Sequence, residues 1–306
     1  MLEFRNVTIE KNRSILLEHF NLTVNDGAIL GIFSNDVKVR EALMQAAVGG
    51  RCPNKGEIIL DEEQVYDHPA DLLGKIGYMP SHYGFHERIR VDECYDAFLT
   101  LYHVVGRRRV NRVSQVLVAL GLEKYEKSFI GELPEEELPF LALGRAILHQ
   151  PQWLFLEEPF ANMNLKDRTK MVNILLNLAE LGVSLVITSQ SYPDVNDIFS
   201  DIAVIEGSHL KTQGSLEEVV EEAINRSPIR MHLLSGLEEA LSVLKEEPTV
   251  DRVIVDGMDV IFRFTGTDED QARILSEMVK RGALIHHYSR DQLDLSDIFH
   301  LGVEEN

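Results

Sequence analysis

Two adjacent carboxylates, Glu157 and Glu158, follow directly after the apolar run Trp153–Leu156. A short apolar run predicts a strand buried on both faces, so the pair is expected at the end of a buried strand. Two carboxylates in that position are costly unless a metal ion, an arginine or several hydrogen-bond donors compensate their charge. The sequence therefore favours a partnered site, and it leaves equally open a surface pair held by lysine or backbone donors.

A polar segment, Ser34–Val39, lies between the apolar run Ala28–Phe33 and the helical segment Arg40–Val48. Strand, loop and helix in this order form the frame of phosphate-binding loops, because N–H groups at a helix N-terminus attract anions. Such loops follow the pattern GxxxxGK[ST], in which glycines permit positive φ and close approach of the backbone to phosphate. Here the glycines are missing, and Val37 and Val39 disfavour that backbone shape. A polar turn without a ligand is therefore favoured over a working phosphate loop.

Two charged runs stand out in the middle of the chain. Glu135–Glu137 follow Leu133-Pro134 and suit the start of a helix, where carboxylates complement the helix dipole. Arg107–Arg109 lie in a segment of helical pattern, so a solvated helix face is favoured over a phosphate-binding patch.

The elements that must position these residues alternate between helices and buried strands. The helical segment Lys166–Leu181 precedes the apolar run Val183–Thr188, which predicts an α/β layer with a parallel sheet. The first 30 residues predict paired strands. A boundary is expected near Ser227-Pro228, followed by a small α+β unit with a strand pair at Arg252–Phe264 and a helix at Asp268–Arg281.

The composition narrows the classes of function. The chain has 306 residues and a net charge of −20, which suits two domains and argues against a broad nucleic-acid-binding face. Its two cysteines, Cys52 and Cys94, predict no disulfide framework or zinc site and favour a reducing compartment. No apolar stretch is long enough to predict a membrane span.

The order of these segments resembles the ATP-binding cassette family, the nucleotide-binding subunits of ABC transporters, over roughly residues 2–225. The matching stretches, in family order, are Val24–Gly31, Lys55–Ile58, Ile76–Pro80, Ala142–Pro151, Leu154–Pro159, Asp201–Gly207 and Gln213–Ser215. The tail resembles the small C-terminal domain of subunits that serve ABC-2 type exporters, through the segment Leu293–Leu301.

The resemblance implies an α/β fold of the P-loop NTPase type, in two domains. Residues 1–226 would form the cassette, with a parallel core sheet, an antiparallel β subdomain and a helical subdomain at about residues 87–145. Residues 227–306 would form a small α+β C-terminal domain.

It also implies ATP and Mg²⁺ as cofactors, at positions where the family's motifs have degenerated. The phosphate loop (Walker A) becomes Ser34, Asn35, Asp36, Val37, Lys38, Val39, Arg40 and Glu41. The signature motif LSGGQ becomes Leu133, Pro134, Glu135, Glu136 and Glu137. Glu158 takes the place of the general base, and Glu157 and Glu41 that of the Mg²⁺ ligands. Ser81 takes the Q-loop position, and Gln190 the switch position, where it cannot carry a proton as histidine does.

Three functions remain open at this point. The first is a cassette subunit of an ABC-2 type transporter with weak or no ATP binding and hydrolysis, acting as structural or regulatory partner of an integral-membrane permease or of a second cassette. It would form a homo- or heterodimer, dock through about Ser81–Arg112, bind no nucleic acid, and lie in the cytoplasm, at the inner face of the membrane through its permease. The second is an active ATPase that energises export with Arg40, Lys38 and Glu158. The third is a soluble regulatory scaffold unrelated to transport.

Overall fold

The computed structural model describes residues 1–67, 72, 74–104, 106–190, 198–219 and 228–290. The chain divides into two compact units, Met1–Leu216 and Glu217–Asn306, which are treated separately below. The domain boundary expected between residues 226 and 227 and the closing segment Leu293–Leu301 both lie outside the described residues.

The first unit begins with an antiparallel sheet. Its strands are β1 (Leu2–Lys11), β2 (Ser14–Val24), β4 (Lys55–Leu60) and β5 (Glu63–Gln64), in the order β2-β1-β4-β5. Leu2 pairs with Val24 on one side and with Leu60 on the other, and all three side chains are buried. The alternation of apolar and polar residues thus places one face of this sheet against a core.

A second sheet is mainly parallel. Its strands are β3 (Ile29–Phe33), β6 (Ile76–Met79), β7 (Trp153–Glu157), β8 (Ser184–Ser189), β9 (Asp201–Glu206) and β10 (His209–Ser215), in the order β10-β9-β3-β8-β7-β6. All neighbours run parallel except β10, which pairs antiparallel with β9. Every residue of β3, β7 and β8 is buried, as the apolar runs predict.

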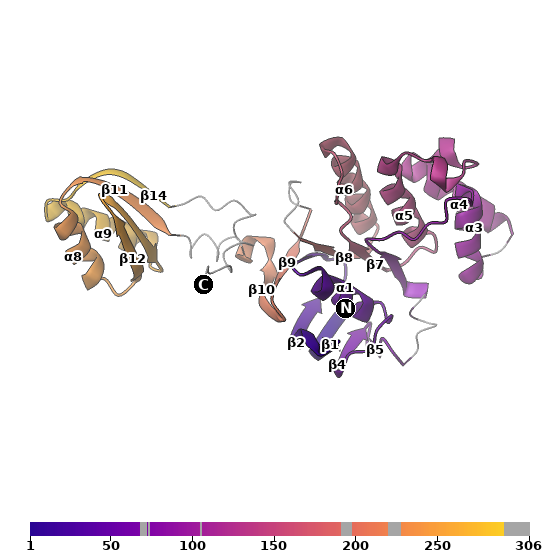
Figure 1. Cartoon of the computed structure of the whole chain (residues 1–306), viewed down its shortest axis with the longest axis horizontal. Coiled ribbons are helices and arrows are strands. Elements are labelled where there is room, and N and C mark those ends of the chain that lie inside the picture. The colour runs from indigo at the N-terminus through magenta and orange to yellow at the C-terminus, as the bar shows by residue number, and fades with distance from the viewer. Residues whose placement is uncertain (68–71, 73, 105, 191–197, 220–227, 291–306) are drawn as a thin grey trace. The chain divides into compact units, whose positions relative to one another are not determined.

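Helices α1 and α6 both contact this sheet. Helix α1 (Val37–Ala47) contacts β2, β7 and β8, and its buried face joins one core with residues of both sheets. Helix α6 (Leu165–Glu180) contacts β8. Figure 1 shows α1 beside the antiparallel sheet and α6 away from it. Helix α1 therefore links the two sheets just below the predicted phosphate loop.

A helical part of the first unit comprises α3 (Val91–Leu101), α4 (Arg107–Leu120) and α5 (Leu138–Ile147), with 3₁₀ turns at Glu123–Tyr125, Ile130–Glu132 and Glu135–Glu137. The Tyr95 hydroxyl of α3 donates to the Leu141 carbonyl of α5 at 2.9 Å. Gly144 is required at this crossing, because a Cβ there would lie 1.9 Å from the Tyr95 hydroxyl oxygen. Helix α5 also approaches β6, where a Cβ on Gly77 would lie 2.3 Å from the Ala146 carbonyl oxygen.

The second unit folds in the order β11 (Ile229–Ser235), α8 (Leu237–Glu246), β12 (Val250–Asp256), β13 (Asp259–Phe264), α9 (Asp268–Lys280) and β14 (Leu284–Arg290). Its strands form an antiparallel sheet in the order β12-β13-β11-β14, over a core of its own. The predicted strand pair and the helix after it are confirmed, whereas β11 and α8 were not predicted. None of the helices in the described parts of the chain combines the length and the apolar composition that crossing a bilayer requires.

Candidate functional site

The carboxyl ends of β3, β7 and β8 bring distant residues together. The Ser34 N–H donates to the Ser189 carbonyl at 3.3 Å, and the Glu158 N–H donates to the Thr188 carbonyl at 2.9 Å. Parallel strands end at the same sheet edge, where α/β folds place their ligands. The predicted phosphate loop and the carboxylate pair therefore share one edge, as the sequence leads one to expect.

The loop at this edge is shorter than the sequence predicts. Helix α1 was expected to begin at Arg40, but it begins at Val37, so only Ser34–Asp36 remain outside regular structure. Asp36 is the N-cap, and its carboxylate accepts a 2.8 Å hydrogen bond from the Lys38 N–H. The short Asp36 side chain that caps the helix, and the absence of glycine from this stretch, explain the early start. The N-terminus of α1, where a phosphate would bind, thus carries a carboxylate of the chain itself.

Arg40 lies inside this turn rather than at the surface. Its side chain is 6% exposed, and its Nη2 lies 2.9 Å from Glu158 Oε1. Its Nη1 donates to the Ser34 carbonyl. The other carboxylate oxygen of Glu158 accepts from the Ser189 hydroxyl at 3.2 Å. The two charges thus compensate each other at the sheet edge, while the buried Glu158 Oε1 has no hydrogen-bond partner among the described residues.

Glu157 is buried, and both of its oxygens have donors. Tyr78 donates its hydroxyl to one, and the Ser81 N–H donates to the other at 3.1 Å. Burial, this hydrogen bond and the charge of Glu157, together with the nearby Glu41, raise the pKa of Tyr78 far above its ordinary value. The hydroxyl therefore remains a proton donor at neutral pH. Glu157 is satisfied by a tyrosine and a backbone donor of the chain itself.

The groups at this edge do not fit Mg²⁺ and a triphosphate. The α1 cap, the Arg40 charge and the oxygens of Glu157 are all engaged within the chain. Among the described residues, no group of three or more His, Cys, Asp or Glu side chains is arranged to hold a metal ion. Glu41 is half-buried and adds a further negative charge. The carboxylates of Glu41, Glu157 and Glu158 favour a positive charge at this sheet edge, and Arg40 supplies that charge.

The remaining predicted residues are dispersed. Asn35, Val37 and Lys38 are exposed on the loop and first turn, whereas Val39 is buried. Gln190 is exposed, one position beyond the Ser189 that contacts Glu158.

The signature stretch forms an acidic turn before α5. Leu133 is buried and Pro134 half-buried, while Glu135 and Glu136 are exposed. Glu137 lies 3.7 Å from Lys124 Nζ. The predicted acidic helix start is therefore a 3₁₀ turn whose carboxylates face solvent or a lysine of the same chain.

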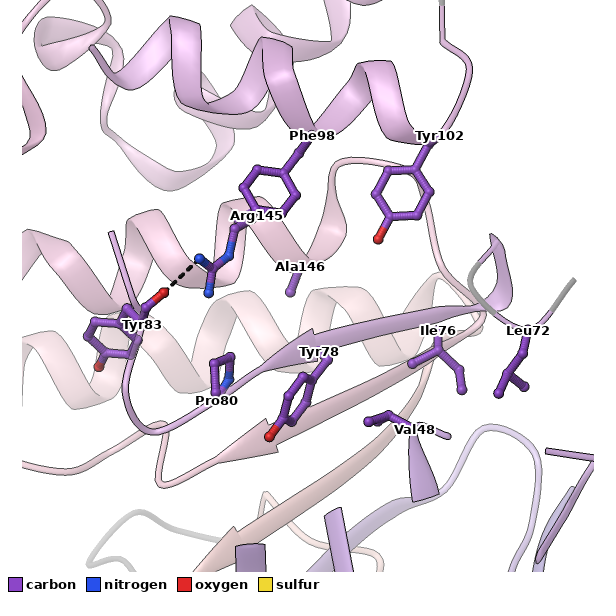
Figure 2. A pocket seen from close by; sticks show the side chains of 10 residues that line it. All are labelled: Val48, Leu72, Ile76, Tyr78, Pro80, Tyr83, Phe98, Tyr102, Arg145 and Ala146. Carbon is purple, nitrogen blue, oxygen red and sulfur yellow. Dashed lines mark hydrogen bonds between the residues drawn. The ribbon is translucent and has the colours of Figure 1, made fainter. Parts of the chain in front are cut away.

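A cavity of about 400 Å³ opens between β6, α3 and α5. Figure 2 shows Tyr78, Phe98, Tyr102 and Arg145 around it, with the Arg145 guanidinium donating to the Tyr83 carbonyl at 2.7 Å. The guanidinium carbon also lies 5.3 Å from the centre of the Phe98 ring. Sequence reasoning missed Tyr78 and Arg145, although a lone arginine within the apolar stretch of α5 was a signal for the latter.

Known proteins resemble the chain at low identity. No model of a protein family matches it. A spermidine/putrescine import ATP-binding protein, PotA of Pasteurella multocida (strain Pm70), is 25% identical over 226 residues, which are 74% of this chain and 61% of the relative. The chain thus spans about three fifths of that relative's length. A methionine import ATP-binding protein, MetN of Streptococcus pneumoniae serotype 4, is 20% identical over 301 residues, 94% of this chain and 84% of the relative.

Solved structures of ATP-binding cassettes resemble about seven tenths of the chain. A dimeric post-hydrolysis state of an ATP-binding cassette bound to ADP and Pi superposes with a TM-score of 0.63 at 17% identity, over 71% of this chain and 99% of that one. This likeness shows the fold, and the curated relatives point the same way. The matched part of the chain therefore has the fold of an ABC cassette, and the chain is similar to ATP-binding proteins of import systems.

Proposed function

We propose that this chain is a cassette subunit of an ABC transport complex that acts as a structural or regulatory partner and binds and hydrolyses ATP weakly or not at all. The observation that carries this proposal is the ion pair between Arg40 and Glu158 within the turn where a phosphate would bind. In a working site, nucleotide and metal compensate the charged groups at this turn. Here the Arg40–Glu158 pair and the Asp36 cap compensate these groups within the chain.

Admitting a triphosphate has a clear electrostatic cost. The phosphates would approach Asp36, Glu41 and Glu157, and Arg40 would have to leave Glu158. Two like charges about 4 Å apart repel by roughly 4 kcal/mol at an effective dielectric constant of 20. Lys38, exposed on the first turn, is a single cation against these carboxylates. An active ATPase built on Arg40, Lys38 and Glu158 is therefore disfavoured.

A partner cassette would also meet negative charge from this chain. In the family a signature motif meets the nucleotide of the opposite subunit. Here Glu135 and Glu136 are exposed at that position. Carboxylates facing a triphosphate would weaken the partner's site too, so we infer that pairing with this chain modulates rather than completes a second site.

The aromatic cavity supports docking to a membrane subunit. Tyr83, Phe98 and Tyr102 line it, and all three fall within the predicted docking segment Ser81–Arg112. A concave site with apolar walls and one arginine suits an apolar segment with an exposed polar end. We propose that a short segment of a permease occupies it.

The type of transport stays a prediction. The ABC-2 export type depends on Leu293–Leu301, which lie outside the described residues, whereas PotA and MetN are named as import proteins. A place at the inner face of the membrane, through the permease, is part of the same proposal.

The proposal is tested by titrating the full chain with MgATP in a calorimeter and by assaying ATP hydrolysis, first by the chain alone and then after addition of a candidate permease. We expect no binding heat at millimolar MgATP and no turnover above background. The control is a variant with the motif restored, Ser34→Gly and Val39→Gly with Arg40→Lys and Glu41→Ser, which is expected to gain affinity. Micromolar binding by the wild-type chain, with turnover that Glu158→Gln abolishes, would refute the proposal.

A further inference from the structure

A second cavity, of about 480 Å³, lies between the segment after α3, helix α4 and the C-terminal end of α5. Four of its lining residues carry cationic or ionisable nitrogen groups: His103, Arg108, Arg112 and His149. Asn111, Gln115 and Gln150 add amides. Among the described residues that line this cavity, none is Asp or Glu. On a chain with a net charge of −20, two arginines in a cavity without a carboxylate are a local excess of positive charge.

Arg112 is the residue that most needs a partner. Its Nε donates to the Leu148 carbonyl at 2.7 Å and its Nη2 to the Ile147 carbonyl at 2.6 Å. Burial lowers the pKa of its guanidinium. Within the described chain, no carboxylate lies within 4.0 Å of Arg112 or Arg108. Helix carbonyls fix the orientation of a guanidinium but carry only partial charge, so a half-buried cation here lacks a counter-ion.

A solvated helix face does not account for the whole arginine run. Arg109 forms a two-pronged ion pair with Asp96 and is thereby compensated. Arg108, the preceding residue, lines the cavity instead. Of the two described side chains, Arg109 therefore forms a salt bridge and Arg108 lines the cavity.

His149 adds a hydrogen-bond acceptor. Its Nε2 lies 2.8 Å from the Ile76 carbonyl, so Nε2 carries the hydrogen. Its Nδ1 is buried and has no partner among the described residues. Burial and the nearby Arg112 lower the pKa of His149, which keeps the ring neutral at pH 7 and Nδ1 an acceptor. An anion beside Arg112 would supply the counter-charge that the guanidinium lacks.

An apolar cavity of about 520 Å³ adjoins the cationic one. The two share Arg112, Gln115 and Gln150. The apolar cavity is lined mainly by apolar side chains, among them Val116, Ala119, Leu178 and Leu181. Leu181 is 80% exposed, so the apolar surface is open to a ligand. Charge on one side and apolar walls on the other suit a molecule with a polar head and a hydrocarbon chain.

We propose that the two cavities together bind an anionic amphiphile, with its phosphate head at Arg108 and Arg112 and its alkyl chain along Val116 and Ala119. The site lies apart from the Arg40–Glu158 pair, and its occupation does not depend on the state of that edge. Its ligand is either a membrane lipid or a soluble alkyl phosphate, which share this chemistry.

The probe is hexyl phosphate, compared with inorganic phosphate by calorimetry on the full chain. Hexyl phosphate is expected to bind at least roughly tenfold more tightly than inorganic phosphate, because burial of two methylene groups stabilises the complex by about that factor. Arg108→Gln is expected to weaken both ligands about tenfold, because a charge-assisted contact is lost. Ala119→Phe, which fills the apolar cavity, is expected to weaken hexyl phosphate alone.

Arg109→Gln is the matched control, since it removes the same charge one position along α4 from a residue paired with Asp96. Neither variant touches the packed core, so folding does not confound the comparison. Co-sedimentation with phosphatidylcholine vesicles containing phosphatidic acid separates the two sources. Vesicle binding that Arg108→Gln abolishes supports a lipid, and hexyl phosphate binding without vesicle binding supports a soluble ligand. No binding in either assay, or equal losses in Arg108→Gln and Arg109→Gln, would overturn the proposal.

Discussion

The guanidinium of Arg40 and the carboxylate of Glu158 are each costly to bury alone, and each has the other as its partner. A working site satisfies its lysine and its general base with nucleotide and water. In this chain a longer, planar cation at the lysine position reaches both Glu158 and the Ser34 carbonyl. Arginine in place of lysine keeps the positive charge, but this charge is compensated by Glu158 and not by a nucleotide.

Replacing Glu158 by glutamine tests this pairing through stability. The variant leaves a buried guanidinium without a counter-ion, so the free energy of unfolding is expected to fall by about 3–5 kcal/mol. Urea unfolding followed by the fluorescence of Trp153, the single tryptophan, reports on the first unit. Glu135→Gln, at an exposed acid, is the control and should change stability by less than about 0.5 kcal/mol. Equal stabilities of the Glu158→Gln variant and the wild type would contradict the pairing.

His149 makes stability depend on pH. Burial holds its pKa in the folded chain below the ordinary value of 6.5, so the unfolded chain takes up a proton first as the pH falls. Stability is then fully present above pH 6.5 and declines below it. The free-energy difference between wild type and His149→Phe, measured by urea unfolding, should shift in favour of the variant between pH 7 and pH 5. A difference that stays constant over this range would rule out the titration.

At the scale of elements, the strands were the most predictable. The apolar runs ending at Phe33, Leu156 and Thr188 match β3, β7 and β8 closely, because strands buried on both faces need continuous apolar residues. The start of α1 was wrong, since the Asp36 cap outweighed the family pattern of a longer loop. Strand β11 and helix α8 were not predicted.

The site itself was predictable only in part. Its sheet edge followed from the order of strands, and Glu157 and Glu158 were expected there. Their partners were not, because Tyr78 and Arg40 reach them through side-chain directions that sequence spacing does not encode. Any buried carboxylate is expected to have an arginine or a backbone donor as its partner. Which residue supplies that partner depends on packing.

The crossing of α3 and α5 depends on Gly144. A methyl group there would lie 1.9 Å from the Tyr95 hydroxyl oxygen, so Gly144→Ala must displace that ring from its bond to Leu141. Overpacking of this kind is expected to cost about 1–3 kcal/mol, measured by Trp153 fluorescence in urea. Gly74→Ala is the control, because nothing lies within 4 Å of its added methyl group. Equal effects of the two substitutions would argue against a tight crossing.

At the scale of the molecule, each unit has a hydrophobic core of its own. Phe262 is buried in the second core, and Trp153 lies in the first. Phe262→Ala is expected to destabilise the second unit by about 3–5 kcal/mol. Its far-ultraviolet circular dichroism transition should move to lower urea, while the Trp153 fluorescence transition stays in place. A joint shift of both transitions would mean that the units unfold as one.

In the whole chain, the turn at the N-terminus of α1 is occupied by the chain's own side chains, Asp36, Arg40 and Glu158. The most direct measurement is a crystal structure of the full chain soaked in MgATP, examined at the N-terminus of α1. We expect no nucleotide there, with Arg40 Nη2 still within ion-pair distance of Glu158 and Asp36 still capping Lys38. A triphosphate bound at this turn, with Arg40 released from Glu158 and Asp36 displaced, would contradict the account.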